Sequence, residues 1–289
     1  MTDKIEIKPG YTVGVLGCGT MGTAVLNAML ETKAKTEGSD KTSIIPGRFL
    51  AAVNSDASAK RLTDTYGDKV ELFLQKNNDL VKQSDMIILG CKPFMLDKIV
   101  GDIPQDLFKG KVVVSLLAGK TIAQLEDYTG DHAVIARAMT NTPSKIGHGM
   151  TVVSFPQHGV TDSVRSSINW IFENTGRCLF LEEKHQDVAT ALCGSGPAFC
   201  YLFMEAMCDG AVRMGMPYPL AQECAAQVLK GAAEMVHQEG HPAVLRSKVC
   251  TPAGTTIGGL MVMEDNKVRS AVARSIEEST NIATALGKK

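Results

Sequence analysis

The sequence predicts an α/β protein, with an N-terminal, Rossmann-like doubly wound sheet followed by an all-α C-terminal domain. In the first half of the chain, short β-branched runs alternate with stretches of helical spacing, and from about residue 183 only helical periodicity continues. Near-continuous apolar strands that alternate with helices indicate a parallel sheet covered by helices on both faces. The change of pattern divides the chain into residues 1–182 and residues 183–289.

The first domain is expected to contain buried strands at residues 12–16, 49–53, 70–73, 85–89, 112–116 and 133–136, with 151–154 and 178–181 extending the sheet. Helical spacing occurs between several of them, at residues 21–30, 58–66 and 162–174. The connection between the first two strands is unusually long because residues 32–47 add a polar, lysine-rich stretch. We interpret that stretch as a surface insertion.

The second domain is expected to be helical at residues 185–215, 219–238, 256–264 and 268–286. The helix that follows Pro197 is apolar on nearly every face, because Glu205 and Asp209 alone interrupt the run from Phe199 to Asp209. A helix that is apolar on every face must be buried on every face. A few helices cannot enclose it, so we predict an obligate homodimer through this half of the chain.

Composition narrows the possible partners and compartments. The net charge is −1 and the sequence has no cluster of Lys and Arg, which argues against nucleic acid or an anionic membrane as a partner. No apolar run approaches the ~20 residues that cross a bilayer, and residues 1–10 lack the apolar core of a secretory signal. The eight cysteines show no zinc-site spacing, so we expect no metal and a soluble protein in the reducing cytoplasm.

The segment Gly17-Cys18-Gly19-Thr20-Met21-Gly22 is a G-x-G-x-x-G motif that follows a predicted strand and opens a predicted helix. In that context the first glycine permits a tight turn, the second lets the backbone approach a pyrophosphate, and the third packs the helix on the strand. Free N–H groups at the start of the helix then bind the phosphates. The motif predicts a dinucleotide-binding domain over residues 1–182.

The end of the second predicted strand bears on the choice between NADPH and NADH. An acidic residue there would bind the ribose 2′-hydroxyl of NADH. Asn54 and Ser55 occupy the tip instead, Asp56 comes later, and further donors follow at Ser58, Lys60 and Arg61. Because hydroxyl, amide and cationic donors suit a 2′-phosphate, the sequence favours NADPH, with NADH as the alternative.

Four further segments have a composition that points to ligand binding. Three follow the expected carboxyl ends of strands, the edge where doubly wound sheets bind ligands. They are Cys91-Lys92-Pro93, Ala118-Gly119 and Arg137-Ala138-Met139-Thr140-Asn141-Thr142-Pro143. The fourth segment, residues 249–257, precedes a predicted helix and contains Pro252-Ala253-Gly254-Thr255-Thr256.

With these motifs, and with Gly194-Ser195-Gly196-Pro197-Ala198-Phe199 and Asp209-Gly210, the chain resembles pyrroline-5-carboxylate reductases along essentially its whole length. The resemblance implies NAD(P)H-dependent reduction of 1-pyrroline-5-carboxylate to L-proline, the last step of proline biosynthesis. It also implies a Rossmann domain and a helical dimerisation domain with interleaved partners, and some members form larger rings of dimers.

Carried over by position, the resemblance implies a dinucleotide site at Leu16, Gly17, Cys18, Gly19, Thr20, Met21, Asn54, Ser55, Asn77, Gly90, Cys91, Lys92, Pro93, Ala118 and Gly119. It implies substrate contacts at Glu183, Thr255 and Thr256. Two departures are visible: the insertion at residues 32–47 is atypical of the family, and the family's Ser-Pro-Gly-Gly reads Thr251-Pro252-Ala253-Gly254 here. A methyl group therefore replaces a hydrogen in the expected substrate loop.

The turn before the helix at residue 256 suggests how a small anionic imine is bound. The N–H groups from Gly254 to Ile257 and the two threonine hydroxyls form a cradle for a carboxylate. The Thr256 hydroxyl is the candidate catalytic group, because it can hydrogen-bond the imine nitrogen and relay a proton from water. The substrate site is thus expected at Glu183, Gly254, Thr255 and Thr256.

Two other functions are compatible with parts of this sequence. A β-hydroxyacid dehydrogenase, or another imine reductase, shares the plan, but hydroxyacid enzymes need a catalytic lysine on the long helix, and residues 185–215 contain none. A nucleotide sensor without turnover is the other alternative. The Thr255-Thr256 turn argues against it, because a sensor needs no site for a substrate carboxylate.

Overall fold

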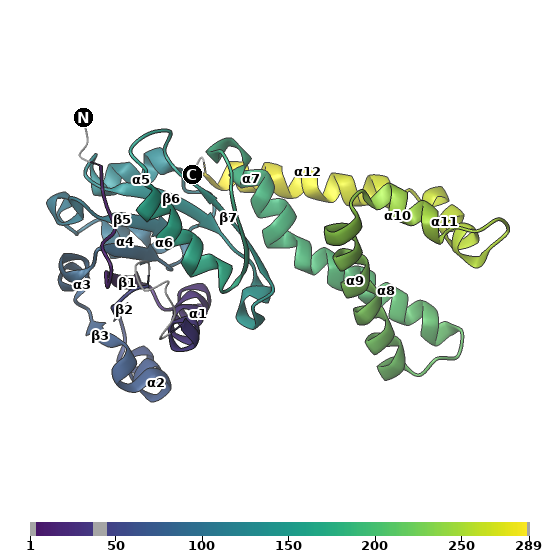
Figure 1. The fold of residues 1–289 in the computed structure, drawn as a ribbon, viewed down its shortest axis with the longest axis horizontal. Coiled ribbons are helices and arrows are strands. Elements are labelled where there is room, and N and C mark those ends of the chain that lie inside the picture. Colours follow the sequence, from purple (N-terminus) through teal and green to yellow (C-terminus); the bar gives the residue numbers. More distant parts are fainter. Residues whose placement is uncertain (1–3, 37–44, 288–289) are drawn as a thin grey trace. The chain divides into compact units, whose positions relative to one another are not determined.

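The computed structural model describes residues 4–36 and 45–287 (Figure 1). The chain forms two compact units. The first comprises Met1–Gly194 together with Ser279–Lys289, and the second comprises Ser195–Glu278. The sheet belongs to the first unit, and the described part of the second unit is helical.

The first unit contains an eight-stranded sheet in the order β3-β2-β1-β4-β5-β6-β7-β8. Neighbouring strands from β3 to β6 are parallel, β7 is antiparallel to β6, and β8 is parallel to β7. The order reverses between β1 and β4, which makes the doubly wound topology with its ligand-binding switch point. The strands are β1 Thr12–Leu16, β2 Arg48–Val53, β3 Glu71–Leu74, β4 Met86–Leu89, β5 Val112–Ser115, β6 Val134–Met139, β7 Gly149–Ser154 and β8 Gly176–Phe180. The predicted fold class is confirmed.

Helices cover both faces of this sheet and bury two apolar cores. One core includes Leu26, Leu62 and Ile168, which come from the three helices on the first face: α1 Thr20–Thr36, α2 Asp56–Tyr66 and α6 Asp162–Glu173. The other core includes Leu80 and Leu125, and its helices are α3 Asn77–Gln83, α4 Leu96–Val100 and α5 Ile122–Thr129. Burial on both sides explains why β4 and β5 consist almost wholly of Val, Ile, Leu and Met.

Short 3₁₀ turns complete the connections of this unit. They are η2 Gly67–Lys69, η3 Pro93–Met95, η4 Gln105–Phe108, η5 Thr142–Ile146 and η6 Glu183–His185. Side-chain caps start three of the helices, at Ser55, Thr121 and Thr161. Each of these hydroxyls accepts a hydrogen bond from a first-turn N–H group that has no partner within its helix.

The predicted insertion at residues 32–47 is partly wrong in shape. Helix α1 does not end near residue 30 but continues to Thr36, and Thr32 is buried. The Lys33 ammonium donates a 2.8 Å hydrogen bond to the carbonyl oxygen of Gly47 and lies over the ring of Phe49. The start of the lysine-rich stretch is therefore helical, and residues 37–44 lie outside the described residues.

A continuous helical stretch follows the sheet, made of η6, α7 Gln186–Ala189, the π-helical turn η7 Thr190–Ser195 and α8 Gly196–Arg213. By length and composition alone, Glu183–Arg213 could cross a bilayer, and it is the one such helix among the described residues. This corrects the expectation that no apolar stretch reaches that length. A helix that is apolar on all faces passes the same test when a second protein chain covers it.

The second unit contains α8, α9 Tyr218–Glu239, α10 Pro242–Val249, α11 Thr255–Asp265 and the first part of α12 Val268–Gly287. Helices α8 and α9 pack through small side chains, and the buried apolar residues that the structure describes in this unit are Cys208, Ala221 and Ala225. Large apolar side chains remain exposed, among them Leu202 at 66 % and Val262 at 61 %. Such a surface requires a covering partner.

Candidate functional site

The glycine turn lies between β1 and α1 at the carboxyl edge of the sheet. Gly17 has a φ of +92°, and a Cβ atom there would lie 2.8 Å from the backbone nitrogen of Cys91, so a side chain is excluded. Gly19 has open space where its Cβ would be, with no atom of the described chain within 4 Å. The turn thus has a crowded inner side and an open outer side, which is the arrangement that lets a phosphate approach the backbone.

A cavity of about 540 Å³ opens over this turn, a size in the usual range of small-molecule sites. Nearly all of the predicted cofactor residues line it: Gly17, Cys18, Gly19, Thr20, Met21, Asn54, Ser55, Asn77, Gly90, Cys91, Lys92, Pro93 and Ala118. Leu16 does not, because its side chain is fully buried beneath the turn. Gly119 lines a smaller neighbouring cavity instead. The structure therefore brings together residues from the ends of β1, β2, β4 and β5.

The part of the cavity next to β2 is lined by hydroxyl and cationic groups. The Ser55 hydroxyl caps α2 and hydrogen-bonds the Ser58 hydroxyl at 3.0 Å, and Arg61 follows one turn later on the same helix. The Arg61 guanidinium donates a 2.8 Å hydrogen bond to the carbonyl oxygen of Cys18. Neither Asp56 nor Lys60 lines the cavity. No acidic side chain stands among the described lining residues, so the donors there suit an added phosphate.

Two cysteine thiols lie in this cavity, and burial keeps both neutral. Burial raises the pKa of Cys18 to about 12, against a smaller opposing effect of the nearby Arg61 charge. Burial also raises the pKa of Cys91 to about 11. The thiolate is the reactive form of cysteine, so neither residue offers a nucleophile at neutral pH. Their role here is to shape the cavity without adding negative charge.

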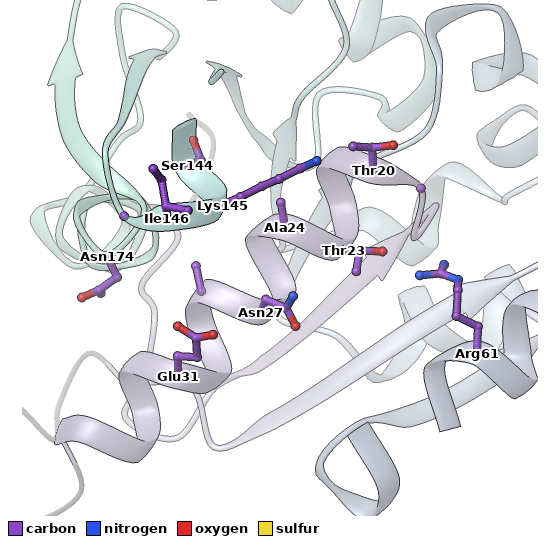
Figure 2. A pocket seen from close by; sticks show the side chains of 13 residues that line it. Thr20, Thr23, Ala24, Asn27, Glu31, Arg61, Ser144, Lys145, Ile146 and Asn174 are labelled. Atoms are coloured by element: carbon purple, nitrogen blue, oxygen red, sulfur yellow. The ribbon is translucent and has the colours of Figure 1, made fainter. Parts of the chain in front are cut away.

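A second cavity, of about 670 Å³, lies along the outer face of α1 and shares Gly19, Thr20 and Arg61 with the first (Figure 2). In Figure 2 the side chain of Lys145 extends toward Thr20 at the start of α1, while Arg61 reaches toward α1 from α2. No sequence motif predicts a specific role for Lys145. The signal was its place just after Thr142-Pro143, because the connection that follows β6 starts at the ligand edge.

The smaller cavity, of about 150 Å³, is bordered by Met21, residues 116–119, residues 137–140, Gln186, Thr190 and Gly194. Gln186 is buried and donates to the carbonyl oxygens of Arg137 at 3.0 Å and Val152 at 3.3 Å. Asn141 donates to the carbonyl oxygen of Cys193 at 3.0 Å and accepts from the N–H of Met150. These bonds tie the π-helical turn to the segment after β6, which explains why that segment is rich in polar residues.

Glu183, a predicted substrate contact, has a carboxylate that is already engaged within the first unit. Its Oε1 atom accepts from Nη1 of Arg137 at 2.8 Å and from the N–H of Ile122, the first residue of α5, at 2.7 Å. The Arg137 side chain is 8 % exposed, and its Nη2 atom also lies 3.7 Å from Asp187. A buried guanidinium needs such a partner, so this carboxylate has a clear structural role.

The turn before α11 shows how Gly254, Thr255 and Thr256 are arranged. Gly254 is the residue before the helix, and a Cβ atom there would collide with the Thr251 hydroxyl. Thr255 and Thr256 are the first two residues of α11, so their N–H groups have no acceptor within the helix. Ala253 has a φ of +54°, a left-handed conformation that disfavours residues other than glycine. This turn belongs to the second unit, and the cavities belong to the first.

Metal chemistry has no support in the part of the chain that the structure describes. Over residues 4–36 and 45–287, no group of three or more His, Cys, Asp or Glu side chains is placed to hold a metal ion. The first unit contains a nucleotide-sized cavity that is lined by hydrogen-bond donors suited to a phosphate and by two neutral thiols. What the second unit offers is a helix N-terminus with two adjacent hydroxyls, suited to a small carboxylate.

Comparison with known proteins covers both units. Residues 183–286 match the family described as pyrroline-5-carboxylate reductase dimerisation, and residues 12–119 match NADP oxidoreductase, coenzyme F420-dependent. The pyrroline-5-carboxylate reductase of Schizosaccharomyces pombe is 41 % identical over 279 residues, which cover 95 % of this chain and 98 % of the relative. That of Lophium arboricola is 40 % identical over 96 % of this chain and 93 % of the relative.

A solved structure of the Plasmodium falciparum pyrroline carboxylate reductase, with NADP bound, has the same fold. Its TM-score is 0.80 at 25 % sequence identity, and the match covers 97 % of this chain and 100 % of that chain. The likeness thus extends over both units and not over the dinucleotide-binding half alone.

Proposed function

This chain belongs to the pyrroline-5-carboxylate reductase family, and from that premise we propose how its residues carry out the reaction. The chain is an NAD(P)H-dependent oxidoreductase that reduces the C=N bond of 1-pyrroline-5-carboxylate to give L-proline, the last step of proline biosynthesis. The observation that carries the assignment of residues is the 540 Å³ cavity over the glycine turn, with its open position at Gly19.

Residues 1–182 serve as the dinucleotide-binding domain in this proposal. The residues that would hold NAD(P)H are Gly17, Cys18, Gly19, Thr20, Met21, Asn54, Ser55, Asn77, Gly90, Cys91, Lys92, Pro93, Ala118 and Gly119, which line the two cavities, with Leu16 buried beneath the glycine turn. The pyrophosphate would be bound by the N–H groups at the start of α1. Lys145 and Arg61 would add positive charge on two sides of that turn. The support is that both line the 670 Å³ cavity together with Gly19 and Thr20. When bound, the reduced nicotinamide supplies a hydride to the imine carbon.

NADPH is the preferred cofactor in this proposal, and NADH is the weaker one. Ser55, Ser58 and Arg61 line the end of the cavity where an acidic residue would mark an NADH enzyme. Their hydroxyl and guanidinium groups are donors for a 2′-phosphate. The support is the composition of the lining, which holds these donors and no carboxylate among the residues described.

Residues 183–289 form the dimerisation and substrate-binding domain in this proposal. The substrate carboxylate is held by the first N–H groups of α11, with Gly254, Thr255 and Thr256 forming the cradle. The Thr256 hydroxyl donates a hydrogen bond to the ring nitrogen and passes it a proton from water, while the hydride adds to carbon. One hydride and one proton convert the imine to the amine. Glu183 contributes to the substrate site from its place beside Arg137.

The assembly is a homodimer through the helical half, with larger rings of dimers as a further level, in the cytoplasm. Exposed apolar side chains on α8 to α12 support the dimer, and all eight cysteines are free thiols, which suits a reducing compartment. The net charge of −1 without basic clusters argues against nucleic acid or a membrane surface as a partner. The apolar stretch Glu183–Arg213 is assigned to the interface between subunits.

The experiment that tests this function mixes the purified protein with NADPH and 1-pyrroline-5-carboxylate and follows the nicotinamide absorbance. We expect rapid oxidation of NADPH and formation of L-proline. The kcat/KM for NADH should be lower than that for NADPH. A β-hydroxyacid with NADP⁺ is the control substrate and should give no turnover. Turnover of the hydroxyacid without turnover of the imine would contradict the proposal, and so would binding of NADPH without turnover of either.

A further inference from the structure

The last helix of the chain ends against the Ala118-Gly119 turn. Helix α12 begins in the second unit and finishes in the first, where Gly287 meets Gly119. A Cβ atom on Gly287 would lie under 3.0 Å from the carbonyl oxygen of Gly119, and one on Gly119 would lie 3.1 Å from the nitrogen of Gly287. The two backbones are therefore in direct contact, with no room for a side chain on the Gly287 side.

Further contacts hold the end of this helix in place. The Gln124 side chain donates from Nε2 to the carbonyl oxygen of Gly287 at 2.8 Å, and its Oε1 accepts from the N–H of Thr121 at 3.0 Å. The same side chain thus closes the capping box of α5 and binds the last turn of α12. One turn earlier, the Thr284 hydroxyl donates to Asp187 at 2.9 Å, and Ala283 is buried.

The turn that this helix touches stands between two cavities. Ala118 lines the 540 Å³ cavity, and residues 116–119 line the 150 Å³ cavity beside it. Gly119 has a φ of +78°. Because glycine populates many backbone conformations, the local sequence alone does not restrict the turn to this one. A neighbouring backbone that packs against the turn removes that freedom, and the contact with Gly287 does so.

We propose that the C-terminal end of α12 is a positioning element for the cofactor site: by packing Gly287 on Gly119, it fixes the Ala118-Gly119 turn. The inference rests on the proposed role of that turn in binding NADPH. The residues that act through the turn are Gly287, Gln124 and Thr284, and none of them lines either cavity. They are positioning residues. Substitutions that remove their contacts should weaken NADPH binding more than they lower the turnover number at saturating NADPH.

The first test is Gly287→Ala, which places a methyl group against the Gly119 carbonyl. We expect the dissociation constant of NADPH, measured by its fluorescence, to rise about threefold to tenfold, because the turn must shift. The turnover number at saturating NADPH should fall by less than that. Ala285→Ser is the matched control, because Ala285 is exposed on the same helix turn and the change should leave NADPH affinity unaltered.

The second test is Gln124→Glu, which separates the two bonds of this side chain. A glutamate at that position still accepts from the Thr121 N–H and suits the start of α5, so the capping box remains. It cannot donate to the Gly287 carbonyl, and its charge repels that oxygen. We expect the same weakening of NADPH binding as for Gly287→Ala, with a melting temperature within about 2 °C of the parent. If Gly287→Ala fails to fold, this variant decides.

Two results would overturn the proposal. One is an NADPH dissociation constant equal to that of the parent in Gln124→Glu. The other is a loss of thermal stability in the variants with unchanged NADPH affinity, which would make the contact merely structural. Fluorescence binding needs no turnover. Failure of the parent to reduce 1-pyrroline-5-carboxylate would therefore contradict the proposed function while this measurement still tested the positioning element.

Discussion

The guanidinium of Arg61 donates a 2.8 Å hydrogen bond to the carbonyl oxygen of Cys18, and so joins α2 to the glycine turn. The two residues lie 43 positions apart in the chain and line the same cavity. The bond places a cation where the cavity meets the end of β2, the region that distinguishes NADPH from NADH. Arg61 is therefore the residue that we expect to contribute most to the proposed preference for NADPH.

Replacing Arg61 with Gln should weaken NADPH binding more than NADH binding. A charge-assisted hydrogen bond to phosphate is worth ~1.5–3 kcal/mol, and the exposure of this side chain places the loss at the low end, so KM for NADPH should rise about tenfold. KM for NADH should change little. Lys60→Gln is the control, because Lys60 is on the same helix but outside the cavity lining. Equal losses for both cofactors in Arg61→Gln would remove Arg61 from phosphate recognition.

Replacing Ala253 with Gly should stabilise the protein. Ala253 has a φ of +54°, and the left-handed conformation costs a non-glycine residue ~1–2 kcal/mol. The greater freedom of glycine in the unfolded chain offsets part of that gain, which leaves about 0.5–1 kcal/mol. Urea unfolding at fixed protein concentration measures it. Ala271→Gly, inside α12, should have the opposite sign. Loss of stability in Ala253→Gly would show that the methyl group makes a compensating contact.

The free energy of unfolding should decrease above about pH 9. Burial raises the pKa of Cys18 and Cys178 to about 12 and that of Cys91 to about 11, from an ordinary value of 9.0. The unfolded chain releases these protons near pH 9 while the folded chain keeps them. Their contribution is therefore fully present below pH 9 and is lost as the pH rises toward 11 to 12.

Denaturant unfolding between pH 7 and pH 11 measures this effect, with the Cys18→Ala, Cys91→Ala, Cys178→Ala triple variant for comparison. The variant should lose less stability than the parent over the same interval. Parallel pH dependence in the two proteins would assign the loss to other groups. Iodoacetamide at pH 7 should also leave these three thiols unmodified in the folded parent.

Replacing Leu202 with Glu should dissociate the dimer. The side chain is 66 % exposed in the single chain, on a helix with few polar positions. Covering a leucine is worth ~1.5–3 kcal/mol per subunit, and a buried carboxylate adds a further cost. Light scattering should report a monomer and the melting temperature should drop. Glu205→Gln, on the same helix, serves as the control. A stable dimer in Leu202→Glu would place the interface elsewhere.

Most of the sheet could be predicted because its strands are short apolar runs with an unambiguous pattern. The predicted strand at residues 12–16 has the same ends as β1 in the structure, and the ends of the other predicted strands agree within about three residues. Helix α10 was missed, because Pro242–Val249 has eight residues, is mostly exposed and buries no apolar side chain. The extension of α1 to Thr36 was missed because a lysine-rich helix face looks like a loop when only polarity is considered.

Most residues that line the 540 Å³ cavity could be grouped from the sequence, because they follow β1, β2, β4 and β5, and the carboxyl ends of these strands share one edge. That they bind the cofactor stays a prediction. The contacts Arg137–Glu183 and Gly119–Gly287 could not be predicted. The two residues of each pair lie 46 and 168 positions apart in the chain, and neither residue type nor spacing indicates such a contact. Glu183 is the clearest example of what the sequence does not show. Its carboxylate accepts hydrogen bonds from Arg137 and from the N–H of Ile122 at the start of α5, and no motif predicts either contact.

The most direct measurement is the rate of hydride transfer to 1-pyrroline-5-carboxylate in Thr256→Val, with Thr256→Ser as the control that keeps the hydroxyl. Valine preserves the branched shape and removes the donor, so we expect transfer to slow by about tenfold to a hundredfold while NADPH affinity is unchanged. The serine variant should retain most of the rate. Transfer in Thr256→Val as fast as in the parent would contradict the proposed proton donation to the ring nitrogen.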